Sequence, residues 1–271
     1  MREVDRMSSS LLMPKILRWG ALLFALAALL LPVCAEEVGP WRKRTFKSSD
    51  GLLLPYRLLS PTSVDSSKRY PLVLSLHGAG ERGCDNATQL KNGVNEFYLA
   101  HRERYPAFVL APQCPEGQRW VEVDWTNPSH VMADHPSAPL QAVIELLDAA
   151  ERELPIDRSR VYVVGLSMGG FGTWELLARQ PERFAAAVPI CGGADLATAP
   201  RVRLVPVWAF HGAADPVVGV QRSATMVEAL RALGVSVRYT EYPEVGHDAW
   251  VHAFAEPELA PWLFGRHRDE R

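Results

Sequence analysis

The sequence predicts an α/β domain built on a mostly parallel sheet of about eight strands, with helices on both faces and an antiparallel hairpin at the N-terminal end. Eight short runs are rich in β-branched and aromatic residues, and glycine and proline clusters separate them. Several of these runs alternate with segments of helical spacing, which favours parallel strands joined by helices. The chain has 271 residues, 48% of them hydrophobic and 22% charged, a balance typical of one globular domain of this size.

The elements follow from these patterns in chain order. The predicted strands are residues 41–46, 52–59, 71–76, 108–111, 160–164, 185–190, 205–210 and 237–242. The first two flank a turn cluster at residues 48–51 and form the hairpin. Apolar residues at helical spacing predict helices over 139–154, 171–179 and 221–233, and one more that starts near Asp248. Residues 114–136 show little periodicity and predict a long loop, a feature that is usually functional in a domain of this kind.

The N-terminus has the composition of a targeting segment. Lys15 and Arg18 precede the apolar run 21–33, which is short for a membrane span. Together with the small residue Ala35, this pattern predicts a secretory signal peptide, residues 1–35, that is cleaved after Ala35. Residues 36–271 would then form a single domain, secreted or periplasmic, with no stable membrane association.

Other interpretations of the N-terminus remain open. The chain could start at Met1, Met7 or Met13, and the last choice gives a leader of ordinary length. The leader could also stay uncleaved as an anchor, or end at a lipid-modified Cys34.

Three cysteines follow the leader. Cys84 and Cys114 both lie in loops just after predicted strands, so we expect a disulfide between them in an oxidising compartment. Cys191 ends an apolar run and is expected in the core. No Cys/His cluster has metal-ligand spacing, so we expect no metal and no cofactor. The formal net charge is −2 without a basic stripe, which argues against a nucleic-acid partner.

Ser167 stands at a sharp corner between a predicted strand and a predicted helix. The pentapeptide from Gly165 to Gly169 fits the pattern G-x-S-x-G, which lifts a serine hydroxyl above the sheet. Chance alone often produces this pentapeptide, so the strand, turn and helix around it give the signal its weight. Ser167 is therefore the candidate nucleophile.

A serine nucleophile needs a base and an acid that orients the base. His247 follows the last predicted strand, and Asp215 follows the strand before it. Their order along the chain after Ser167 is the one expected for a nucleophile of this kind. His252 remains open as an alternative base, and Asp195 as an alternative acid.

Two backbone N–H groups are candidates for an oxyanion hole. Met168 follows the nucleophile at a helix N-terminus, and Ala79 lies in the glycine-rich loop after residues 71–76. Glu81 and Arg82 next to this loop either pair and hold it or form a solvated rim.

Three tryptophans are candidates for substrate binding. Trp120, Trp125 and Trp250 could form an aromatic wall for an acyl or sugar group. Ordinary loop packing is the alternative for Trp120 and Trp125.

Four motifs in this order resemble the α/β-hydrolase superfamily over about residues 41–265. They are Leu76-His-Gly-Ala-Gly80, Gly165-Leu-Ser-Met-Gly-Gly170, Phe210-His-Gly-x-x-Asp215 and Gly246-His247. The chain is most similar to the secreted esterase branch with polyhydroxybutyrate-depolymerase-like and feruloyl-esterase-like proteins. Dienelactone hydrolases and prolyl-oligopeptidase catalytic domains are more distant, and dienelactone hydrolases have a cysteine in place of Ser167. The resemblance implies a serine carboxylesterase that acts on small-molecule esters, with carbohydrate and phenolic esters among the candidates.

Two other functions remain open. A serine peptidase would use the same three residues, and a catalytically inactive binding protein would use the same scaffold. The sequence leaves the oligomeric state undetermined.

Overall fold

The computed structural model of the chain describes residues 39–268. The predicted signal peptide, with its cleavage site at Ala35 and the alternative starts, lies outside these residues. Secretion, cleavage and the single-domain organisation stay predictions.

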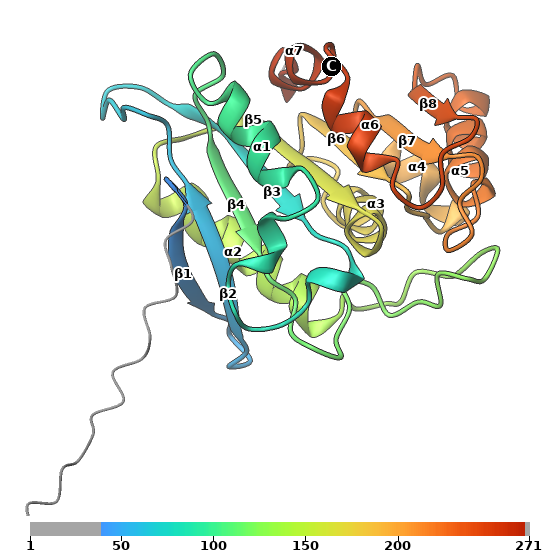
Figure 1. Ribbon diagram of the computed structural model, residues 1–271, viewed down its shortest axis with the longest axis horizontal. Helices are drawn as coiled ribbons and strands as arrows, with labels where there is room; N and C mark the ends of the chain where they lie inside the picture. Colours follow the sequence, from blue (N-terminus) through green and yellow to red (C-terminus); the bar gives the residue numbers. More distant parts are fainter. Residues whose placement is uncertain (1–38, 269–271) are drawn as a thin grey trace, which may run out of the picture. The chain divides into compact units, whose positions relative to one another are not determined.

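One sheet organises the described residues (Figure 1). Its strands are β1 (Arg42–Lys47), β2 (Leu53–Leu59), β3 (Tyr70–Leu76), β4 (Phe108–Pro112), β5 (Ile156–Leu166), β6 (Ala186–Ile190), β7 (Trp208–Gly212) and β8 (Arg238–Tyr242). They lie in the order β1-β2-β4-β3-β5-β6-β7-β8. The β1–β2 and β2–β4 pairs are antiparallel, and all later pairs are parallel. The predicted fold class is confirmed, including the N-terminal hairpin.

Helices cover both faces of the sheet. They are α1 (Val94–His101), α2 (Ala138–Glu153), α3 (Met168–Arg179), α4 (Ala199–Val202), α5 (Gln221–Ala232), α6 (Trp250–Ala255) and α7 (Leu259–Phe264). Short 3₁₀ turns occur at η1 (Ala79–Glu81), η2 (Thr88–Leu90) and η3 (Leu196–Thr198). Buried residues of α2, α3 and α5 share one hydrophobic cluster, and those of α1, α6 and α7 share the other. The sheet is therefore doubly wound.

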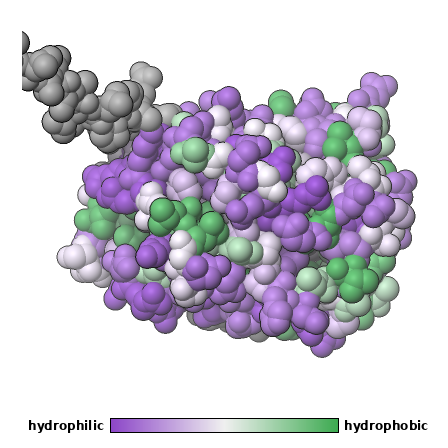
Figure 2. Space-filling model, turned by 90° about the horizontal axis from the view of Figure 1, so that it is seen from below, coloured by the Kyte–Doolittle hydropathy of each residue, from purple (hydrophilic) through white to green (hydrophobic). Residues whose placement is uncertain are grey.

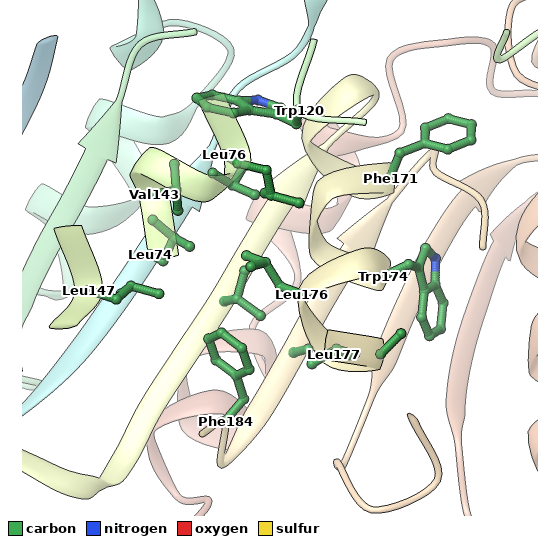
Figure 3. Close-up of a cluster of buried hydrophobic side chains, with 14 of the residues drawn as sticks. Leu74, Leu76, Trp120, Val143, Leu147, Phe171, Trp174, Leu176, Leu177 and Phe184 are labelled. Atoms are coloured by element: carbon green, nitrogen blue, oxygen red, sulfur yellow. The ribbon is translucent and has the colours of Figure 1, made fainter. Parts of the chain in front are cut away.

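The alternation of side chains along the strands produces these two clusters. In β3, Leu72, Leu74 and Leu76 belong to the cluster under α2 and α3, while Val73 belongs to the opposite one. Figure 3 shows Leu74 and Leu76 beside side chains of α2 and α3. Both faces are buried, which explains why this strand has a continuous apolar sequence.

Several elements differ from the prediction. The strand β5 begins at Ile156 rather than at residue 160, and the predicted C-terminal helix is two short helices, α6 and α7. The strand predicted at residues 205–210 begins only at Trp208. Pro206 lacks the N–H that a hydrogen bond to the neighbouring strand needs. Only its carbonyl takes part, and it accepts from the Ala187 N–H at 3.0 Å. The helix α1 was not predicted, because it has only eight residues and follows Gly93 in a left-handed conformation.

The cysteines correct one expectation. Cys84 is exposed, Cys114 is buried, and both are free thiols, so the predicted disulfide is wrong. Cys191 is buried in the core, as predicted. Burial raises the pKa of both the Cys114 and the Cys191 thiols to about 12, so both stay protonated.

Hydrophilic side chains dominate the face drawn in Figure 2, and apolar side chains there form separate patches. Among the helices of residues 39–268, none is both long enough and apolar enough to cross a bilayer.

Candidate active site

Ser167 occupies a strained corner between β5 and α3. Its φ of 53° and ψ of −118° are unusual for a residue other than glycine. The Ser167 N–H donates to the Ile190 carbonyl at 2.8 Å, which ties the corner to β6. A Cβ on Gly165 would lie 2.1 Å from the Gly169 carbonyl oxygen, so helix and strand approach too closely for any side chain there.

A continuous chain of hydrogen bonds links three of the predicted residues. The Ser167 Oγ lies 2.8 Å from His247 Nε2, and His247 Nδ1 lies 2.7 Å from Asp215 Oδ2. Ser167 comes from the end of β5, Asp215 follows β7 and His247 follows β8. These strands are parallel, so their carboxyl ends meet at one edge of the sheet.

The Asp215 carboxylate is fully buried, and both of its oxygens accept hydrogen bonds. Burial alone would raise its pKa, but hydrogen bonds from His211 and His247, and from the Val218 and Val217 N–H groups, hold the pKa of Asp215 well below its ordinary value. The two backbone bonds measure 2.9 and 2.8 Å and both end on Oδ1. The carboxylate is therefore charged at neutral pH and fixed in direction.

Sequence reasoning missed His211 as part of this site. Its Nδ1 lies 2.7 Å from the Ser223 hydroxyl, and its Nε2 lies 2.9 Å from the Val218 carbonyl and 3.4 Å from Asp215 Oδ2. An acceptor carbonyl at Nε2 indicates that this nitrogen carries the hydrogen. His211, the residue before the last one of β7, is therefore a second donor to the carboxylate. Its position before a strand-end glycine was the available signal.

Cys191, His211 and Asp215 bring possible metal-ligand atoms within 4.8 Å of one another. Both ring nitrogens of His211 already have protein partners, and Asp215 faces His247. We interpret the group as support for the carboxylate rather than a metal site.

The glycine-rich loop after β3 is held by polar contacts. Burial lowers the pKa of His77 to about 4, with a smaller contribution from the positive charge of Arg82, so the ring is neutral. His77 Nε2 accepts from the Cys114 N–H at 2.9 Å, and Nδ1 donates to the Gly78 carbonyl at 2.6 Å. Arg82 Nε donates to the Ala79 carbonyl at 2.8 Å.

Glu81 and Arg82 therefore do not pair with each other. Arg82 holds the loop through Ala79, while Glu81 Oε1 accepts from Asn92 Nδ2 at 2.9 Å. Burial raises the pKa of the Glu81 carboxyl.

The predicted oxyanion groups lie beside the serine. Met168 is the first residue of α3, where helix N–H groups lack intrahelical partners and carry partial positive charge. Ala79 lines the same pocket as Ser167 and His247.

This pocket has a volume of about 220 Å³. Trp125 and Trp250 line it, together with Val217 and Asn92, which the sequence analysis did not single out. The Trp250 ring lies edge-on to the His247 imidazole, with ring centroids 5.4 Å apart.

Trp120 does not belong to this wall. It is 0% exposed, packs in the core beside α3 (Figure 3), and donates its indole N–H to the His77 carbonyl at 3.0 Å. The prediction that Trp120 binds substrate is wrong, because this part of the loop turns inward to support the strand end.

The alternative acid and base lie elsewhere. Asp195 caps η3 through the Ala197 N–H, and its other carboxylate oxygen accepts from the Met132 N–H at 2.9 Å, which anchors the 114–136 loop. His252 is an exposed residue of α6, and its ring lies tilted beside the Tyr242 ring with centroids 5.1 Å apart.

The strand order of the sheet, the sharp corner at Ser167 and the hydrogen bonds from Ser167 through His247 to Asp215 together define an α/β-hydrolase. Residues 62–256 match the phospholipase/carboxylesterase family, so the chain belongs to that family.

Similar proteins include esterases of several kinds. A bifunctional acetylxylan esterase/xylanase of Neocallimastix patriciarum is 30% identical over 177 residues, 65% of this chain and 24% of that protein. A probable feruloyl esterase C of Aspergillus terreus is 28% identical over 172 residues, 63% of this chain and 58% of that protein. A crystal structure of a thermostable esterase is 40% identical with a TM-score of 0.78, covering 84% of this chain and 63% of that one. The chain thus spans less than two thirds of each of these relatives.

Proposed function

We propose that the protein is a secreted serine carboxylesterase that hydrolyses small-molecule esters through an acyl-enzyme. The observation that carries this proposal is the chain of hydrogen bonds from Ser167 through His247 to the buried, charged Asp215. This arrangement supplies a nucleophile, a base and the acid that orients the base.

The first half of the reaction forms the acyl-enzyme. The Ser167 Oγ attacks the ester carbonyl carbon while His247 Nε2 takes the hydroxyl proton. The carbonyl oxygen becomes an oxyanion that the Ala79 and Met168 N–H groups stabilise. The carbon–oxygen bond to the alcohol then breaks, and His247 returns its proton to the departing alcohol.

The second half releases the acid. His247 takes a proton from water, and the resulting hydroxide attacks the acyl carbon through a second oxyanion. The bond to Ser167 breaks and the serine regains its proton. Asp215 stays ionised throughout and stabilises the imidazolium each time it forms.

The family and the names of these three relatives support an ester substrate. Carbohydrate and phenolic esters are candidates because two relatives are named an acetylxylan esterase and a feruloyl esterase. The leader pattern supports secretion.

The test is the Ser167→Ala variant with p-nitrophenyl acetate as substrate. We expect kcat to fall by about three orders of magnitude or more, since the three residues act as a unit. The exposed Ser236→Ala variant is the matched control and should keep wild-type kcat. Wild-type turnover by Ser167→Ala would refute the assignment.

Two further measurements separate the alternatives. A fluorophosphonate probe should label wild-type protein at Ser167, whereas an inactive binding protein would not react. Short acyl esters assayed beside peptide amides separate a carboxylesterase from a serine peptidase.

A further inference from the structure

A second hollow lies next to the candidate active site, between α1 and α6. It has a volume of about 660 Å³ and is lined mainly by apolar and aromatic residues. The residues that matter for the argument are Phe97, Ala100, Trp250, Val251, Phe254 and Ala255. We call it the α1–α6 groove.

The local sequence keeps this groove open. The Phe97 and Phe254 rings meet across its floor with centroids 5.1 Å apart. Gly93 has a φ of +84°, and a Cβ there would meet the Phe254 ring at 3.0 Å. Ala100 and Ala255 are exposed and small, so they form low walls. Val251 at the rim is 59% exposed, so the apolar lining continues to the surface.

The groove continues from the catalytic pocket. Asn92 and Trp250 line both hollows, so a molecule that passes these two residues reaches from one to the other. Trp250 also packs edge-on against the His247 imidazole. An occupant of the groove therefore lies on the imidazole side of the catalytic serine.

This position selects one half of an ester. The carbonyl oxygen must point to the Ala79 and Met168 N–H groups, and the departing oxygen must reach His247 Nε2 to receive its proton. The alcohol half of the ester therefore lies on the side of the imidazole, where the groove begins at Trp250.

We propose that the α1–α6 groove binds an extended apolar alcohol component of the ester substrate, so that the enzyme prefers esters of longer-chain alcohols. This inference rests on the proposed esterase function and adds a specificity to it. Each methylene buried in the groove should raise kcat/KM roughly two- to fourfold, from the transfer free energy of a buried methylene group.

The experiment compares acetate esters of ethanol, butanol, hexanol and octanol, with released acetate measured at constant pH. We expect kcat/KM to rise along the series, while kcat stays nearly constant where hydrolysis of the shared acetyl-enzyme limits turnover. A parallel series of p-nitrophenyl esters, from acetate to octanoate, varies the acyl half instead. If kcat/KM rose only along the p-nitrophenyl ester series and not along the alcohol series, the proposal would be overturned.

The Ala100→Trp variant fills the groove and should remove the rise of kcat/KM along the alcohol series. The matched control is Ala232→Trp, an exposed alanine of α5 far along the chain from the groove, which should keep the wild-type rise. A rise that persists in Ala100→Trp would overturn the proposal. Should that variant fail to fold, Val251→Asp places a charge at the rim and should flatten the rise in the same way.

Two outcomes locate the failure. A wild-type protein inactive on every ester would refute the proposed function, whereas equal activity along the alcohol series would refute only the groove. A wild-type dimer that becomes monomeric in Val251→Asp would identify the groove as an interface between copies and overturn its assignment to substrate.

Discussion

The neutral, buried His77 should make the protein lose stability in acid. An exposed histidine has a pKa of about 6.5, and His77 in the folded protein has a pKa of about 4. Between these values the unfolded chain binds a proton that the folded protein does not, so stability falls as the pH decreases through this window. The contribution is fully present above pH 6.5 and exhausted below pH 4.

The magnitude follows from the two pKa values. From pH 7 to pH 5, His77 alone should lower the free energy of unfolding by about 2 kcal/mol. The main cause is the burial of the ring, which penalises its charged form, and the Cys114 N–H already occupies Nε2 from 2.9 Å. Protonation would break this bond in a side chain that is only 2% exposed.

The assay is urea denaturation at pH 7 and pH 5 for wild type and His77→Gln. The variant should be less stable at pH 7 by about 1–3 kcal/mol, because a flexible amide replaces the rigid ring that accepts from the Cys114 N–H and donates to the Gly78 carbonyl. From pH 7 to pH 5, the free energy of unfolding of the variant should fall by about 2 kcal/mol less than that of wild type. The exposed His135→Gln variant is the control and should follow wild type. Equal losses in wild type and His77→Gln would show that this histidine is not the origin of the acid sensitivity.

Three further predictions concern the residues around the site. Gly169→Ala would place its Cβ 2.1 Å from the carbonyl oxygen that ends β3, and thermal unfolding should show a loss of about 3 kcal/mol or more; Gly80→Ala, with open space around it, should cost little. His211→Leu removes one donor to Asp215, and steady-state kinetics should show kcat reduced about tenfold to a hundredfold with KM nearly unchanged, whereas an unchanged kcat would make it a purely structural residue. Trp120→Phe should lower the free energy of unfolding by about 1–3 kcal/mol while KM for p-nitrophenyl acetate stays within twofold, and a large increase in KM would return Trp120 to the substrate wall.

The fold and the arrangement of the three candidate residues were accessible from the sequence because parallel sheets obey simple rules. Continuous apolar runs mark strands buried on both faces, and their carboxyl ends meet at one edge. Ser167, Asp215 and His247 each follow such a run, so chain order alone brought them together. Their hydrogen bonds in the structure match this expectation, and their catalytic roles stay a prediction.

The wrong predictions concern segments of the sequence in which apolar residues have no regular spacing. Residues 114–136 contain no helix or strand, so the sequence could not say which side chains turn inward. Trp120 enters the core and Trp125 reaches the pocket, although only five residues separate them. The disulfide between Cys84 and Cys114 was predicted because both residues follow strands. A position in a loop, however, does not determine the direction in which a side chain points. Asp195 was weighed as an acid, whereas it anchors the loop by accepting from the Met132 N–H.

The supports of the oxyanion loop explain why this irregular segment matters for the site. Trp120 donates to the carbonyl of His77, and Arg82 donates to the carbonyls of Ala79 and Gln118 at 2.8 and 3.3 Å. A backbone N–H can stabilise an oxyanion only if its direction is fixed before the charge develops. The long loop supplies two of the groups that fix it, the Trp120 indole and the Gln118 carbonyl. Because the hydrophobic core holds Trp120 in place, a change deep in the core should alter the position of the Ala79 N–H as well as the stability of the fold.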